Sequence, residues 1–315
     1  MIRRILKSVS LLASGPNDTV GGQAVMEGVM IRSKDCLAIA VRKPSGEIFV
    51  ETRPWFSMTP VCLRKPFLRG FPVLLETLVN GIKALNFSAQ QSLDEEEGEI
   101  SPWAMALTMA GAIGFALLLF VVAPHLFSLG MNWLGLSGDA EALSFHMWDG
   151  LFKLLMFVGY ILAISFIPEI RRVFQYHGAE HKVIWAHENS VELSPQAVRD
   201  FSRLHPRCGT TFLLFVLAVS IVLFTFLVPL LIQLWSPQNA VLKQAWIIGV
   251  KFVLMIPISA ISYEIIKFSG KFHKSILCKA LSCPGMAMQM LTTHEPDDAQ
   301  IEVAIAALKG ALGQR

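Results

Sequence analysis

The sequence predicts an α-helical integral membrane protein with four transmembrane helices, a small N-terminal antiparallel β subdomain and a C-terminal amphipathic helix. Composition is the first reason, because 53% of the 315 residues are hydrophobic, only 16% are charged and the mean hydropathy is +0.52. The second reason is that four apolar runs approach or exceed the length needed to cross a bilayer. These runs are residues 103–127, 151–168, 210–234 and 245–266.

Residues 1–60 are predicted to form the β subdomain. Its first 17 residues have a basic beginning, but Lys7 interrupts their apolar part, so we interpret them as a cytoplasmic surface segment rather than a secretory signal. Residues 20–54 read as strands, with a turn at Pro44 to Gly46. So short a sheet buries little core. We therefore expect it to dock on the membrane domain or on a protein partner.

Residues 61–100 are predicted to hold an interfacial helix and an acidic linker. The apolar pattern of residues 66–89 carries Arg69, Glu76 and Lys83, which favours a half-buried position at the membrane surface over a span. The acidic run from Asp94 to Glu97 then leads into the first transmembrane hairpin.

The remaining chain divides into a transmembrane hairpin at 101–170, a cytoplasmic loop at 171–209, a second hairpin at 210–268 and a tail at 269–315. Lys153 and Lys251 fall within the apolar runs, where we expect their long side chains to reach the interface. In the tail, Ile301, Ile305 and Leu308 repeat at helical spacing after an acidic start, which indicates the amphipathic helix.

The distribution of Lys and Arg predicts the orientation. Residues 1–102 hold twelve, residues 171–208 hold six and the tail from Lys267 holds six, against none in 129–148 and one in 235–244. Positive residues stay in the cytoplasm, so both termini and the central loop are expected there. The net charge of +3 without a dense basic tract argues against nucleic acid as a partner. The five cysteines are odd in number and fall on the predicted cytoplasmic side, so no disulfide framework is expected.

The candidate chemistry lies in the central loop, in the string His177-Gly-Ala-Glu180-His181. On a helix, two histidines four residues apart share one face and can hold one divalent ion, while the adjacent Glu180 reaches its water. This H-x-x-E-H order is the inverted zincin pattern. It predicts His177 and His181 as metal ligands, zinc as the metal and Glu180 as general base.

Three further candidate ligands reach the same level of the membrane. His205 and Cys208 precede the third apolar run, and Glu264 lies near the cytoplasmic end of the fourth. A catalytic zinc needs three protein ligands and one open coordination position. One of these three residues would be the third ligand beside the two histidines of the motif. His205 together with Cys208 would instead close a four-ligand structural site. The simpler interpretations are surface histidines at an interface and a Glu264 paired with Lys267.

Five strings of the sequence resemble the YqhQ-type family of bacterial membrane proteins, a domain of unknown function often labelled a predicted metal-dependent enzyme. They are GGQAVMEGVMIR, YHGAEHKVIWAHE, HPRCGTTFL, ISYEIIKFSGK and LTTHEPDDAQIEVAIAAL, in that order over residues 18–308. The resemblance implies a bacterial inner-membrane protein. It supports the interpretation of the H-x-x-E-H motif as a metal site, and the matching positions in this sequence are His177, Glu180, His181, His205, Cys208 and Glu264.

The sequence therefore predicts a multi-pass enzyme that hydrolyses a peptide or lipid-linked substrate with a divalent metal at the cytoplasmic membrane face. A non-enzymatic scaffold with a structural metal site is the alternative. A small transporter is a third possibility, less favoured because the apolar runs carry few charges.

Overall fold

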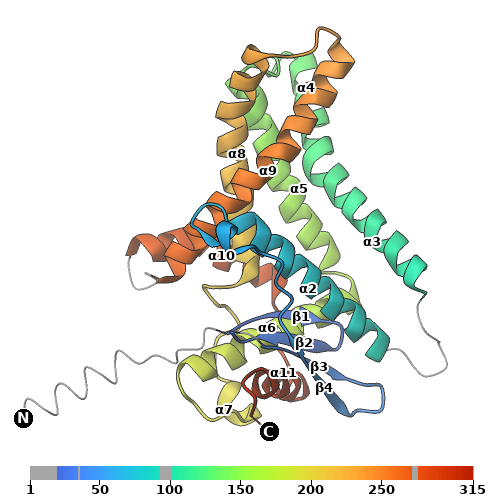
Figure 1. Cartoon of the computed structure of the whole chain (residues 1–315), viewed down its shortest axis with the longest axis vertical. Coiled ribbons are helices and arrows are strands. Elements are labelled where there is room, and N and C mark those ends of the chain that lie inside the picture. The colour runs from blue at the N-terminus through green and yellow to red at the C-terminus, as the bar shows by residue number, and fades with distance from the viewer. Residues whose placement is uncertain (1–19, 35, 93–100, 272–275, 315) are drawn as a thin grey trace, which may run out of the picture.

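In a computed structural model, an apolar helical bundle stands on a smaller layer built from a sheet and helices (Figure 1). The structure describes residues 20–34, 36–92, 101–271 and 276–314. The N-terminal segment before residue 20 and the acidic linker at 94–97 lie outside the described residues, so their interpretations stay predictions.

Four helical stretches are long and apolar enough to cross a membrane, which fits the predicted fold class. They span Ala106–Trp133, Leu143–Ile164, Gly209–Leu234 and Ala240–Phe268. The first is made of α3 (Pro102–Leu117), the π-helical turn η2 (Leu118–Val122) and α4 (Ala123–Trp133). The others are α5 (Leu143–Ile164), α8 (Gly209–Leu234) and α9 (Ala240–Lys271). Figure 1 shows α3 leaning away from the other spans.

Two expectations about the spans are wrong. The second span starts at Leu143 rather than 151, because residues 143–150 are helical and bury Phe145, His146 and Asp149. Lys153 and Lys251 do not extend to an interface either, since both side chains are buried inside the bundle. Asp149, four residues before Lys153 on α5, contacts both amines and so holds them inside.

The predicted strands form one antiparallel sheet in the order β1-β2-β3-β4. The strands are β1 (Gly21–Val25), β2 (Gly28–Arg32), β3 (Cys36–Arg42) and β4 (Ile48–Pro54). The turn between β3 and β4 closes where predicted, with Gly46 at φ 87°. Alternate strand residues point to opposite faces, so the sheet offers two apolar faces for docking.

One face of the sheet packs against α6 (Pro168–Glu188) and α11 (Asp298–Ala311). Ile31 and Ala38 from the strands meet Val183 of α6 and Ile305 and Leu308 of α11. The amphipathic C-terminal helix is thus confirmed, and Asp297 caps it by accepting the Gln300 N–H. The sheet, which has too few residues for a core of its own, shares this core with α6 and α11.

Two more helices lie crosswise between the bundle and the sheet (Figure 1). They are α2 (Gly70–Gln91), at the predicted interfacial segment, and α10 (Ile276–Thr292). The short turns η1 (Val61–Arg64) and α7 (Pro195–Val198) complete the described elements. On α2, the buried Glu76 accepts hydrogen bonds from the N–H groups of Met58 and Thr59, which holds the connection from β4 against the helix.

Candidate metal centre

The H-x-x-E-H string lies on α6, whose second half is largely buried under the sheet, α11 and the loop before α8. Gly178 makes this packing possible. A Cβ on Gly178 would come within 2.2 Å of the His294 carbonyl oxygen, so only glycine lets the chain before α11 cross the helix there. The crossing brings the Thr292 carbonyl onto the first histidine of the motif.

Both histidines of the motif have one ring nitrogen fixed by a backbone carbonyl. His177 donates Nδ1–H to the Thr292 oxygen at 2.8 Å, and His181 donates Nδ1–H to the Arg203 oxygen at 2.5 Å. A carbonyl can only accept, so in each neutral ring the lone pair is on Nε2. Burial lowers the pKa of His181, which keeps that lone pair available.

Cys208 completes a group of three. The ligand atoms of His177, His181 and Cys208 all lie within 4.8 Å of one another, and His177 Nε2 is 3.2 Å from Cys208 Sγ. Cys208 is the N-cap of α8, where the Thr210 N–H donates to its sulfur at 3.4 Å. A thiolate accepts such donors well, because helix N-termini favour negative charge.

These three residues fit a divalent metal of the zinc type. Zinc bonds of about 2.0 Å to nitrogen and about 2.3 Å to sulfur place a tetrahedral nitrogen and sulfur roughly 3.5 Å apart. The 3.2 Å between His177 Nε2 and Cys208 Sγ is close to this value. His181 Nε2 is buried and has no hydrogen-bond partner among the described residues. A buried nitrogen without a partner is unfavourable, and a metal would satisfy it. The fixed Nδ1–H groups are the usual outer contacts of metal-binding histidines.

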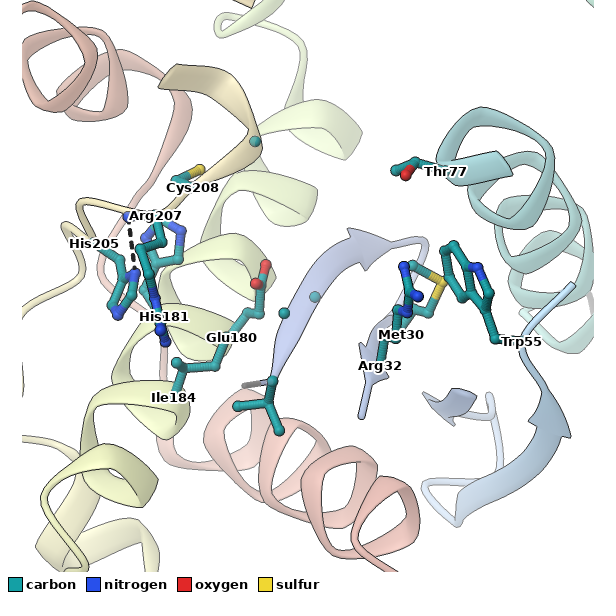
Figure 2. A pocket seen from close by; sticks show the side chains of 14 residues that line it. Met30, Arg32, Trp55, Thr77, Glu180, His181, Ile184, His205, Arg207 and Cys208 are labelled. Carbon is teal, nitrogen blue, oxygen red and sulfur yellow. Dashed lines mark hydrogen bonds between the residues drawn. The ribbon is translucent and has the colours of Figure 1, made fainter. Parts of the chain in front are cut away.

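Glu180 extends from α6 toward the strands, beside the same group (Figure 2). It lines a cavity of about 240 Å³ together with His181, Cys208, Gly22 of β1 and Thr77 of α2. A Cβ on Gly22 would meet the Glu180 carboxyl at 2.8 Å, so this glycine leaves room for it. Burial raises the pKa of Glu180 to about 7, against the opposing influence of His177 and the Gly22 N–H.

The structure brings together His177, His181 and Cys208, and leaves the other two candidate ligands outside that group. His205 faces Glu188, with Nε2 3.4 Å from its carboxylate, and its Nδ1 accepts from the Arg207 N–H (Figure 2). Glu264 accepts two hydrogen bonds from the Arg69 guanidinium, at 2.8 and 2.7 Å. Ligation by either residue stays a prediction that this geometry does not favour.

Sequence reasoning missed the residues that hold the loop before α8. Lys182 donates to the carbonyls of Arg199 and Phe201 at 2.6 and 2.8 Å, and Trp185 donates to that of Leu204 at 2.9 Å. On the other side, Gln289 of α10 exchanges two hydrogen bonds of 2.8 Å with the backbone of His205. The sequence signal that could have pointed to these contacts is Lys182 itself, a lysine directly after His181. No pattern in the sequence indicated which carbonyls accept its hydrogen bonds.

The bundle and this layer fit an integral membrane protein with a two-histidine, one-cysteine cluster below its spans. The chain belongs to the family described as protein of unknown function (DUF1385), whose model matches residues 65–314. It is 35% identical over 309 residues to the uncharacterized protein YqhQ of Bacillus subtilis (strain 168), covering 93% of this chain and 92% of that protein. No solved structure matches the chain. The family resemblance seen in the five strings is thus confirmed.

Proposed function

We propose that this protein is a metal-dependent hydrolase that acts on a peptide or lipid-linked substrate at a membrane surface. One observation carries the proposal. The ligand atoms of His177, His181 and Cys208 lie within 4.8 Å of one another beside a cavity that also receives the Glu180 carboxylate. Three ligands, an adjacent carboxylate and an open cavity are the parts that hydrolytic metal sites share.

His177 and His181 would hold the metal through Nε2, and Cys208 through Sγ. A bound zinc would supply Lewis acidity and activate water near neutral pH. Glu180 accepts the proton of the attacking water and then donates it to the leaving group, which is the role of a general base that turns into a general acid. Gly22 has no Cβ to press on that carboxylate, and its backbone N–H bonds to it.

The position of the cavity supports a substrate that is attached to a membrane or emerges from it. Its lining includes Thr77 of α2, the helix that lies across the end of the bundle, and Gly209 at the start of the third span. The excess of Lys and Arg in the segments around the site supports a cytoplasmic location, with both termini on that side of a bacterial inner membrane.

Metal content tests the first half of the proposal. We expect about one zinc, manganese or iron per chain in the purified protein, and its loss in a His177→Ala/His181→Ala double variant. His187→Ala is the matched control, because this residue is on the same helix but outside the cluster. No metal in the wild type after reconstitution with each of these ions would overturn the proposal.

The second candidate function is a structural metal site, which the position of Cys208 at the start of α8 favours. Because Cys208 begins α8 and the histidines lie on α6, a metal would tie the third span to the layer below it. The Glu180→Gln variant separates the two functions. An enzyme should keep its metal and lose hydrolysis, whereas a structural site should keep its metal, its stability and its cellular function.

A further inference from the structure

A second cluster of titratable side chains lies inside the apolar bundle, far from the metal-site residues along the spans. We name His125 of α4, Asp149 and Lys153 of α5, and Lys251 of α9 the intramembrane cluster. All four are buried, with Lys251 and Asp149 each 1% exposed. Lys251 follows the start of α9 at Ala240 by 11 residues. At about 1.5 Å per residue, that is about 16 Å, roughly half the thickness of a hydrocarbon core.

The members form a continuous chain of polar contacts. Asp149 Oδ2 is 3.4 Å from Lys153 Nζ, and Asp149 Oδ1 is 2.7 Å from Lys251 Nζ. Lys251 Nζ is 3.3 Å from His125 Nδ1, and His125 Nε2 is 2.9 Å from the side-chain oxygen of Gln244. Gln244 is half-buried and near the end of the bundle where α8 and α9 join, at the top of Figure 1. The chain of contacts therefore runs from that end into the middle of the spans.

The charges of the intramembrane cluster do not balance. It has one carboxylate for two amines, and the Phe224 ring of α8 covers both amines at 4.4 and 5.6 Å. Neither α8 nor η2 contains a titratable residue that could add a negative charge. The remaining neighbour, His146 of α5, donates Nε2–H to the Ala140 carbonyl at 2.9 Å and supplies no anion. With both lysines protonated, a net positive charge is buried, which is strongly unfavourable in a membrane.

We propose that the intramembrane cluster is a proton-binding site, which takes up and releases one proton through His125 at the Gln244 end of the bundle. Loss of one proton leaves one ammonium for the one carboxylate and removes the excess charge. The contacts favour a proton over an anion as the ligand, because each amine already has the Asp149 carboxylate as a partner. This inference does not depend on the proposed metal site.

The hydrogen-bond geometry gives the order of the transfer. Gln244 accepts from His125 Nε2–H, so Nδ1 holds the lone pair that faces Lys251. The proton leaves the Lys251 ammonium and joins Nδ1, which produces a neutral amine and an imidazolium. The imidazolium then gives its Nε2 proton to water on the Gln244 side, which leaves a neutral ring with its proton on Nδ1. Rotation of the Gln244 amide then turns its NH₂ group toward the Nε2 lone pair. Lys251 keeps its hydrogen bond to Asp149 throughout.

Proton counting tests the proposal on the full chain in phosphatidylcholine nanodiscs. A weakly buffered sample is titrated between about pH 5 and 9, and the protons released per chain are counted, since unperturbed Lys and Asp side chains titrate outside most of this range. Lys251→Arg keeps the charge and removes the exchangeable proton, because arginine does not deprotonate. Lys153→Met removes the second amine. Lys243→Gln is the matched control, since Lys243 pairs with Glu141 on the exposed end of the same helix.

We expect the wild type and Lys243→Gln to release about one proton per chain more than Lys251→Arg and Lys153→Met over that range. Equal counts in all four proteins would overturn the proposal and leave a permanent ion cluster. Wild-type protein with ¹⁵N-labelled lysine side chains provides a test that needs no variant. A neutral amine signal that appears and disappears with pH in solid-state NMR supports the site, whereas ammonium signals alone at every pH refute it.

Discussion

The two buried polar clusters differ in what completes them. In the group of His177, His181 and Cys208, the backbone fixes both Nδ1 atoms, and His181 Nε2 is left without a partner among the described residues. In the intramembrane cluster, each charged atom contacts another side chain, and the imbalance is in the number of charges. An open lone pair therefore favours a ligand from outside. An excess of positive charge among side chains that already contact one another favours exchange of a proton.

The largest effect is expected in the bundle. Asp149→Ala leaves two buried amines without their carboxylate, and we expect the free energy of unfolding to fall by about 3–5 kcal/mol. Chemical unfolding in mild detergent measures this loss. Replacing Lys153 and Lys251 by Met in the same chain should recover most of it, since no unpaired charge then remains. A loss below about 1 kcal/mol for Asp149→Ala is typical of an exposed ion pair. It would contradict a charged Asp149 buried between the Lys153 and Lys251 amines.

Gly178→Ala tests how the backbone supports the metal-site residues. The added methyl group would press on the His294 carbonyl at 2.2 Å and shift the segment that carries the Thr292 carbonyl. We expect a destabilisation of about 1–3 kcal/mol and a metal affinity about 10–100-fold weaker. Gly159→Ala is the control, because a Cβ there meets nothing within 4 Å. Unchanged metal affinity would show that the Thr292 contact is dispensable.

Glu76 provides a pH test at a third buried polar site, where neutral donors from residues 57–59 hold a single carboxylate. Hydrogen bonds from Thr59 and Ser57 outweigh the burial that opposes them and hold the pKa of Glu76 below its usual range. Its contribution to stability is therefore present above the ordinary pKa of glutamate and is lost as the pH falls through the lowered value.

In Glu76→Gln we expect a loss of about 1–2 kcal/mol near neutral pH and a flatter dependence of the melting temperature on pH. Thermal unfolding from neutral to acidic pH measures both, with Glu47→Gln on the exposed turn as the control. Parallel melting curves for Glu76→Gln and wild type across that range would show that the carboxylate does not carry this dependence.

The smallest effect is expected at Glu264. Its side chain is 16% exposed and pairs with Arg69 rather than with the three candidate ligands. Glu264→Gln should cost about 0.5–1 kcal/mol and leave the metal content unchanged, whereas Cys208→Ser should lower it. Elemental analysis of the two variants decides the third ligand. Loss of metal in Glu264→Gln alone would favour Glu264, one of the third ligands that the sequence leaves open, over Cys208.

The fold was largely predictable because its signals are local. Apolar runs marked the spans, alternation marked the strands, and a capped periodic segment marked α11. The motif on α6 was also visible, since helical spacing alone brings His177 and His181 to one face. The choice of Cys208 over His205 depends on the path of a loop fixed by Lys182 and Gln289, and no local pattern records that path.

The expectation for Lys153 and Lys251 was wrong for a related reason. A lysine in an apolar run reaches the interface only when no partner holds it inside. The sequence could have predicted one of these contacts, because Asp149 precedes Lys153 by four residues, the spacing of an ion pair on a helix. Its second contact, with Lys251, joins residues 102 positions apart and needed the three-dimensional structure.

The crossing at Gly178 also fixes the order of assembly during synthesis. The Thr292 carbonyl is 115 residues beyond His177. Ser33, in the turn between β2 and β3, bonds to the Ala311 carbonyl, 278 residues beyond it. The layer below the spans thus joins the first strands, the middle of the chain and its last helix. It can form only after the fourth span has left the ribosome, and such distant contacts form slowly. A chain that stops after α9 would insert its spans and yet lack the carbonyl that orients His177.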